Sequence, residues 1–199
     1  LVAAFGAALA VSAGARADDV VVETAKFKLV IGGDAAAKSL VLKANGEECL
    51  DARERTPLFA AVQARPFNNE IKLANPNRRT SYPANRVRRE GDDLVVGFET
   101  APYEARLGVR TGEGYVAFTL RDFICARDVA YSGLALDVPP VARFRVLQLP
   151  LKTRTNVGEW LNVTWDARAA AAVVACDPYA DADGECRRDF RLTHVDLHS

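Results

Sequence analysis

The chain has 199 residues, of which 26 are basic, 26 are acidic and 49% are hydrophobic. This size and composition suit one globular domain with a substantial core. The balanced charge lacks the positive surface that general nucleic-acid binding or attachment to anionic membranes requires, so we expect neither partner.

Residues 1–17 have the features of a secretory signal peptide that is truncated at its start. An apolar run, LVAAFGAALAV, leads to Ala15-Arg16-Ala17, and the small residues predict cleavage before Asp18. The run is shorter than the roughly 20 apolar residues that span a bilayer, so a membrane anchor is the weaker alternative. We predict that residues 18–199 are the mature chain, secreted or periplasmic, and the strand-like ending at Ser199 suggests a truncated C-terminus.

Alternation of polar and apolar residues predicts strands along most of the mature chain. The clearest examples are residues 27–31, 40–43, 94–98, 103–110, 116–120 and 141–149. Asn45-Gly46 predicts a hairpin turn that leads into residues 48–52, and the glycines at 112 and 114 predict a second hairpin. Residues 166–174 suit an Asp-capped helix or a strand, and we favour the strand because its neighbours alternate with period two.

These signals recur at the spacing of a sandwich, and no linker or repeat divides the chain. We therefore predict an all-β fold, a single antiparallel β-sandwich domain of roughly a dozen short strands after the signal peptide.

Four cysteines in an oxidising compartment favour disulfide formation. Cys176 and Cys186 bracket a short acidic loop, so we predict this pair first. The alternative is that these two, Cys49 and Cys125 are all small buried hydrophobic residues with free thiols.

The segment from Trp160 to Asp166 offers candidate carbohydrate contacts. On a strand, the alternating apolar residues from Leu161 to Trp165 predict a core face, with the intervening polar residues facing outward. Trp160, Asn162 and Asp166 would then share the outer face, where a flat indole lies beside hydrogen-bonding groups. We predict these three side chains as sugar contacts.

A second candidate lies in an arginine-rich stretch. Arg78 and Arg79 stand near Tyr82, and planar guanidinium groups beside an aromatic ring can bind phosphate, carboxylate or sugar hydroxyl groups. The alternative is ion pairing with acidic neighbours such as Glu90.

Catalytic and metal chemistry have little support in the sequence. On a strand, His194 and His198 would lie roughly 13 Å apart, too far for one ion. The acidic loop 177–185 does not fit an EF-hand, because Tyr179 and Phe190 occupy the positions of its first and last carboxylates. A looser calcium site stays open as the alternative to a solvated turn. We predict no catalytic residue, no metal site and no cofactor.

Several strand patterns resemble one known family. The segments are Phe27-Lys-Leu-Val-Ile-Gly-Gly-Asp34, Ser39 to Glu48, Tyr115 to Leu120 and Gly158 to Asp166. They resemble the galactose-mutarotase-like β-sandwich, a supersandwich, that precedes the catalytic barrel in bacterial secreted glycoside hydrolases, including alpha-galactosidase-like ones.

The resemblance implies that the catalytic carboxylates lie on a barrel of roughly 250 residues, which this chain does not contain. The chain would then be a fragment: a non-catalytic N-terminal accessory domain that packs against the barrel of a hydrolase acting on oligo- or polysaccharide. The alternative is a stand-alone secreted β-sandwich protein with a carbohydrate-binding or structural role.

Overall fold

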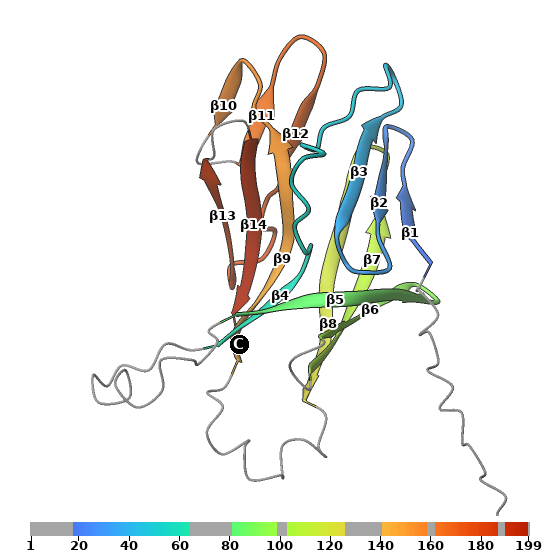
Figure 1. Cartoon of the computed structure of the whole chain (residues 1–199), viewed down its shortest axis with the longest axis vertical. Coiled ribbons are helices and arrows are strands. Elements are labelled where there is room, and N and C mark those ends of the chain that lie inside the picture. The colour runs from blue at the N-terminus through green and yellow to red at the C-terminus, as the bar shows by residue number, and fades with distance from the viewer. Residues whose placement is uncertain are drawn as a thin grey trace, which may run out of the picture.

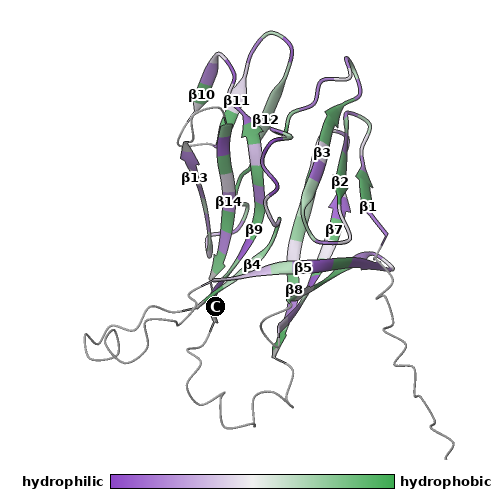
Figure 2. Cartoon of the chain, in the orientation of Figure 1, coloured by the Kyte–Doolittle hydropathy of each residue, from purple (hydrophilic) through white to green (hydrophobic). Residues whose placement is uncertain are grey.

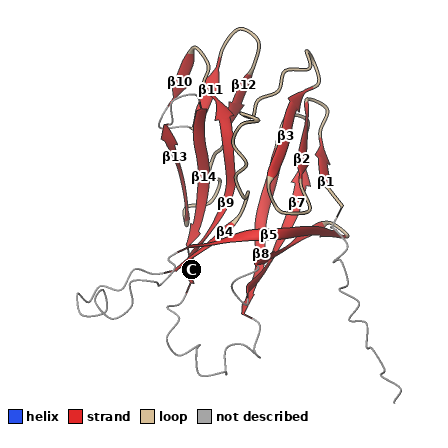
Figure 3. Ribbon diagram, viewed as in Figure 1, coloured by secondary structure: helices blue, strands red, loops and turns tan. Residues whose placement is uncertain are grey.

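The computed structural model describes residues 18–63, 81–98, 103–125, 141–158, 162–186 and 190–198, and these residues form an all-β structure. They contain fourteen strands and no helix (Figure 3). The predicted all-β class is therefore confirmed. Within these ranges, no helix is present that is long and apolar enough to cross a membrane.

The strands form three antiparallel sheets. The first sheet has the order β1 (Val20–Glu23), β2 (Phe27–Ile31), β3 (Ala37–Leu42). The second has the order β10 (Asn156–Gly158), β11 (Val163–Trp165), β12 (Ala170–Ala172). The third has eight strands in the order β13 (Ala180–Cys186), β14 (Phe190–His198), β9 (Val141–Lys152), β4 (Ala60–Gln63), β5 (Ser81–Glu90), β6 (Asp93–Phe98), β7 (Tyr103–Thr111), β8 (Val116–Cys125).

The eight-stranded sheet is curled. In Figure 1, β13, β14 and β9 run up one side, β7 and β8 run up the other, and β5 crosses between them. Register shifts accompany the curl: one separates Thr193 from Val195 in the pairing of β14 with β9, and another separates Arg106 from Leu107 in the pairing of β7 with β8. Bulges of this kind bend a strand and increase its twist, which lets one continuous sheet wrap around a core.

The core lies between the β1–β3 sheet and the curled sheet. Leu29 and Ile31 of β2 are buried in one apolar cluster with Leu94 and Val96 of β6 and Leu107 of β7. Hydrophobic and hydrophilic residues alternate along strands such as β9 and β14 (Figure 2), as expected for strands with one buried face. The two sheets therefore pack face to face, in a sandwich-like arrangement.

Aromatic rings fill the middle of this core. Phe98 and Phe123 each approach Phe144, with centroid separations of 6.3 and 5.5 Å, and Phe59 stacks on Phe144 at 6.1 Å. Edge-to-face and tilted contacts of this type stabilise beyond the area that they bury. Phe144 is 2% exposed and lies at the centre of the group.

Two of the predicted local elements are confirmed, and a third is confirmed only in its turn. β7 and β8 form the second hairpin around residues 112–115, and β12 is the strand favoured for residues 166–174. At the first turn Gly46 has the expected positive φ of 71°, but residues 48–52 form only isolated bridges. The chain there crosses from β3 to β9, because Val41 bridges Glu48 and then Leu50 bridges Leu151.

Cys176, one partner of the predicted disulfide with Cys186, is an exposed free thiol in the structure. It precedes the turn at Asp177 and Ala180, and Cys186 is the last residue of β13. Cys49 is a buried free thiol.

Candidate functional site

The β10–β12 sheet presents an outer face around an exposed tryptophan. Because directly paired residues point to the same side of a sheet, the register defines the members of this face. We call it the Trp165 face: Asn156, Gly158, Val163, Trp165, Ala170 and Ala172. Trp165 is 39% exposed, whereas Thr164 beside it is 1% exposed. The prediction that Trp165 belongs to the core was therefore wrong.

The polar residues expected on the surface point inward instead. The hydroxyl of Thr164 accepts a hydrogen bond from the backbone N–H of Arg154 at 3.0 Å and donates to the carbonyl of Lys152 at 3.3 Å. Asn162, at 1% exposure, donates to the carbonyl of Asp183 at 2.8 Å and accepts two bonds from Arg191. Buried polar groups are tolerated when they are hydrogen-bonded in this way. Asn162 is therefore part of the interior and not an exposed sugar contact.

A glycine lets the indole of Trp165 rest against the neighbouring strand. A Cβ atom at Gly158 would lie 3.5 Å from Cζ3 of Trp165 and 2.7 Å from Cγ1 of Val163. The indole therefore packs over β10 where no side chain intervenes. The alanines of β12 on this face have small side chains, and the ring of Trp165 stays exposed beside them.

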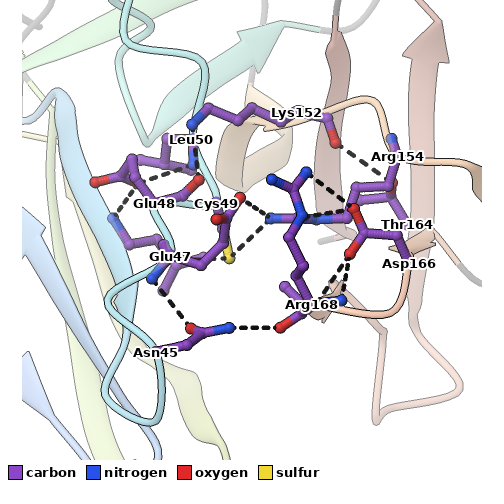
Figure 4. Close-up of polar contacts among 12 residues, drawn as sticks. Asn45, Glu47, Glu48, Cys49, Leu50, Lys152, Arg154, Thr164, Asp166 and Arg168 are labelled. Atoms are coloured by element: carbon purple, nitrogen blue, oxygen red, sulfur yellow. Dashed lines mark hydrogen bonds and ion pairs between the residues drawn. The ribbon is translucent and has the colours of Figure 1, made fainter.

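Arg154 lies beneath this sheet at the centre of a buried polar network (Figure 4). Its side chain is 2% exposed, and its two terminal nitrogens donate to Glu47 at 3.2 Å and Asp166 at 3.1 Å. One of them also lies 3.8 Å from the sulfur of Cys49. Burial opposes the charge, but the hydrogen bonds to Asp166 and Glu47 outweigh it and raise the pKa of Arg154. Its Nε is buried without a hydrogen-bond partner in the described part of the chain.

The network joins segments that are far apart in sequence. Residues 45–50, which follow β3, are held against the end of β9 and the turn at Asp166; we call them the strap. The side chain of Lys152 donates to the carbonyl of Glu48 at 2.9 Å, and Asn45 donates to the carbonyl of Arg168 at 2.7 Å. The strap therefore connects the β1–β3 sheet to the β10–β12 sheet.

Two groups in the network have shifted pKa values. The backbone N–H of Arg168 lowers the pKa of Asp166 to about 2. Partial burial acts in the opposite direction, whereas hydrogen bonds from the N–H of Ala169 and from Arg154 lower the pKa further. Burial raises the pKa of the Cys49 thiol, although Arg154 acts in the opposite direction. At neutral pH the carboxylate of Asp166 is therefore ionised beside the guanidinium of Arg154, and the Cys49 thiol is protonated. The sequence candidate Asp166 is thus a structural anchor, 12% exposed, beside Trp165.

The other sequence candidates divide into two groups. Tyr82 is partly buried and packs edge-on against Tyr103 with centroids 5.9 Å apart, so it belongs to the aromatic core. Trp160, Arg78 and Arg79 lie outside the described residues. The arginines that follow in β5 include Arg88, which pairs with Glu90 at 2.7 Å.

A further polar cluster lies on the outer side of β9 and β14. Asp196 is 4% exposed and receives two hydrogen bonds from Arg145, at 2.8 and 2.9 Å, and one from Arg143 at 3.0 Å. His194 lies 3.8 Å from the same carboxylate. The described side chains contain no group of three or more acidic, histidine or cysteine ligands arranged for a metal ion. Both oxygens of the Asp196 carboxylate therefore accept hydrogen bonds from Arg143 and Arg145.

A cleft of about 680 Å³ lies between the N-terminal residues Asp18 and Asp19, strand β3 and residues 50–55. Three of its charged groups are already paired: Lys38 pairs with Asp19 at 2.6 Å, and the Asp51 carboxylate on its wall is held by Arg53 at 2.6 Å. The Trp165 face, with an exposed aromatic ring, is therefore the stronger candidate for ligand binding.

No protein-family model matches the chain, and no curated protein is significantly similar to it in sequence.

Proposed function

We propose that the chain is a non-catalytic carbohydrate-binding β-sandwich domain that holds a polysaccharide on the Trp165 face. The observation that carries the proposal is the exposed indole of Trp165, which packs against Gly158 in a face of small residues. An indole offers a large rigid surface at low cost in conformational entropy, which suits stacking on the apolar side of a sugar ring.

The charge of the face favours an uncharged sugar chain. All six residues of the Trp165 face are uncharged. The nearest ionic groups, Asp166 and Arg168, pair with one another at 3.3 Å. A polymer of uronic acids or amino sugars would therefore lose hydration without gaining a counter-charge. We infer a neutral polysaccharide as the ligand.

None of the described carboxylates with a resolved pKa shift is suited to act as the general acid of hydrolysis. Every one with a resolved pKa shift is lowered: Glu23, Asp34, Asp51, Glu90, Asp166 and Asp196. A glycoside hydrolase needs a carboxylic acid with a raised pKa to protonate the leaving group. Together with the resemblance in the sequence, this supports an accessory domain of a secreted or periplasmic glycoside hydrolase whose catalytic barrel lies outside this chain.

The proposal is tested by affinity electrophoresis of the chain through gels that contain a neutral β-glucan, a galactomannan, polygalacturonate or chitosan. We expect retardation by a neutral polymer that is insensitive to salt, and Trp165→Ala should weaken it by roughly 30-fold, as for a central tryptophan at an interface. Tyr115→Ala removes a more exposed aromatic ring elsewhere and should retain binding. Retardation by none of the polymers, or equal retardation of both variants, would refute the proposal.

A further inference from the structure

Arg154 contacts both sequence neighbours of Trp165. Its backbone N–H donates to the Thr164 hydroxyl at 3.0 Å, and its guanidinium donates to the Asp166 carboxylate at 3.1 Å. Trp165 is also paired with Asn156 of β10 and Ala170 of β12, but strand β11 has only three residues and its ladders are correspondingly short. Arg154 therefore fixes the chain before and after the indole.

Arg154 is itself fixed from the opposite side by the strap. Glu47 accepts a hydrogen bond from its Nη2 at 3.2 Å across a sequence separation of 107 residues. The guanidinium side chain is 2% exposed, so water does not substitute for a lost protein partner. A charge-assisted hydrogen bond of this kind, shielded from solvent, holds its donor in one orientation.

We propose that Arg154 is a positioning residue for Trp165. The strap contributes to this positioning, because Glu47 holds the guanidinium of Arg154 in place. The role of the indole as a ligand contact rests on the function proposed above, but its positioning does not. Loss of the contact between Glu47 and Arg154 would let the guanidinium rotate toward Asp166 alone, and β11 would move with it. The ring would then no longer rest against Gly158.

The test uses the full chain with Trp160→Phe, so that Trp165 is the remaining tryptophan of two. In this background Glu47→Gln and Arg154→Lys are compared by near-ultraviolet circular dichroism and by acrylamide quenching of tryptophan emission. The matched control is Glu113→Gln, which removes an exposed ion pair with Lys26. We expect both strap variants, but not the control, to lose tryptophan dichroism and to be quenched more efficiently.

Binding to the neutral polymer is measured on the same proteins. We expect Glu47→Gln to weaken it by roughly 10-fold, as for residues that orient a binding side chain without touching the ligand. If Arg154→Lys does not fold, the milder Glu47→Gln carries the test. Dichroism and quenching that match those of the parent in folded Glu47→Gln would overturn the positioning role. Altered spectra without any polymer binding in the parent would uphold positioning and refute the proposed function.

Discussion

Replacement of Arg154 by methionine is expected to destabilise the fold strongly. The side chain is 2% exposed and pairs with Glu47 and Asp166, so its removal leaves acidic groups in a poorly solvated site without their cation. Breaking a buried pair by removal of one partner costs roughly 3–5 kcal/mol in the free energy of unfolding.

Two features of the site place the expected loss toward the lower end of that range. Glu47 is 22% exposed and can turn toward water, and Asp166 keeps the N–H groups of Arg168 and Ala169. The substitution also removes the buried Nε that has no partner among the described residues, which returns roughly 1 kcal/mol. We therefore expect Arg154→Met to lower the free energy of unfolding by about 3 kcal/mol.

Urea unfolding followed by far-ultraviolet circular dichroism measures this loss. The control is Arg121→Met, because Arg121 is 60% exposed and pairs with Asp93 at the surface, where a loss below about 1 kcal/mol is expected. A double-mutant cycle of Arg154→Met with Glu47→Gln should show a coupling of about 1 kcal/mol or more. A loss no larger than that of Arg121→Met, or additive effects in the cycle, would show that Arg154 does not stabilise the fold through its buried contacts.

Three further predictions concern other parts of the molecule. Burial, then the cation of Arg145, lowers the pKa of His194 from 6.5, so the unfolded chain binds more protons and stability falls as the pH drops below about 6.5. His194→Gln should flatten this dependence in urea titrations at several pH values, and an unchanged slope would contradict it. Gly158→Ala places a carbon 2.7 Å from Cγ1 of Val163 on the next strand. We therefore expect the free energy of unfolding to fall by about 1 kcal/mol and the emission of Trp165 to shift. Neither change would be seen if the space above Gly158 were open. Phe144→Ala should cost about 3–5 kcal/mol in urea unfolding, and a loss below about 1 kcal/mol would place Phe144 outside the core.

Much of the fold follows from local patterns. Period-two alternation predicts β7 and β8 because each directs one face toward the core, and the glycine turn at 112–115 joins β7 to β8 as expected. The strap could not be predicted, since its partners Lys152 and Arg154 lie more than 100 residues away, at the end of β9 and just after it. A turn signal such as Asn45-Gly46 specifies a reversal, but not the sheet that the chain then joins.

The candidate site shows the limit of hydrophobicity as a guide to burial. Alternation correctly places Asn162 and Thr164 on the face opposite Trp165, but side-chain polarity assigns the two faces the wrong way round. The polar residues are buried because Arg191 and the backbone of Arg154 satisfy them, and neither partner is recognisable from sequence. Because the polar residues of this strand point inward, the indole of Trp165 on the opposite face is exposed. The backbone before the strand is also unusual, since Asn162 has a positive φ of 44°.

The most direct test of the account is to identify which tryptophan a bound polysaccharide protects. The chain is treated with N-bromosuccinimide with and without the neutral polymer that retards it, and the peptide containing both Trp160 and Trp165 is sequenced by tandem mass spectrometry. If the polymer binds on the Trp165 face, it protects Trp165 from oxidation. Oxidation of Trp165 at the same rate in the presence of the polymer, with protection confined to Trp160, would contradict binding on that face.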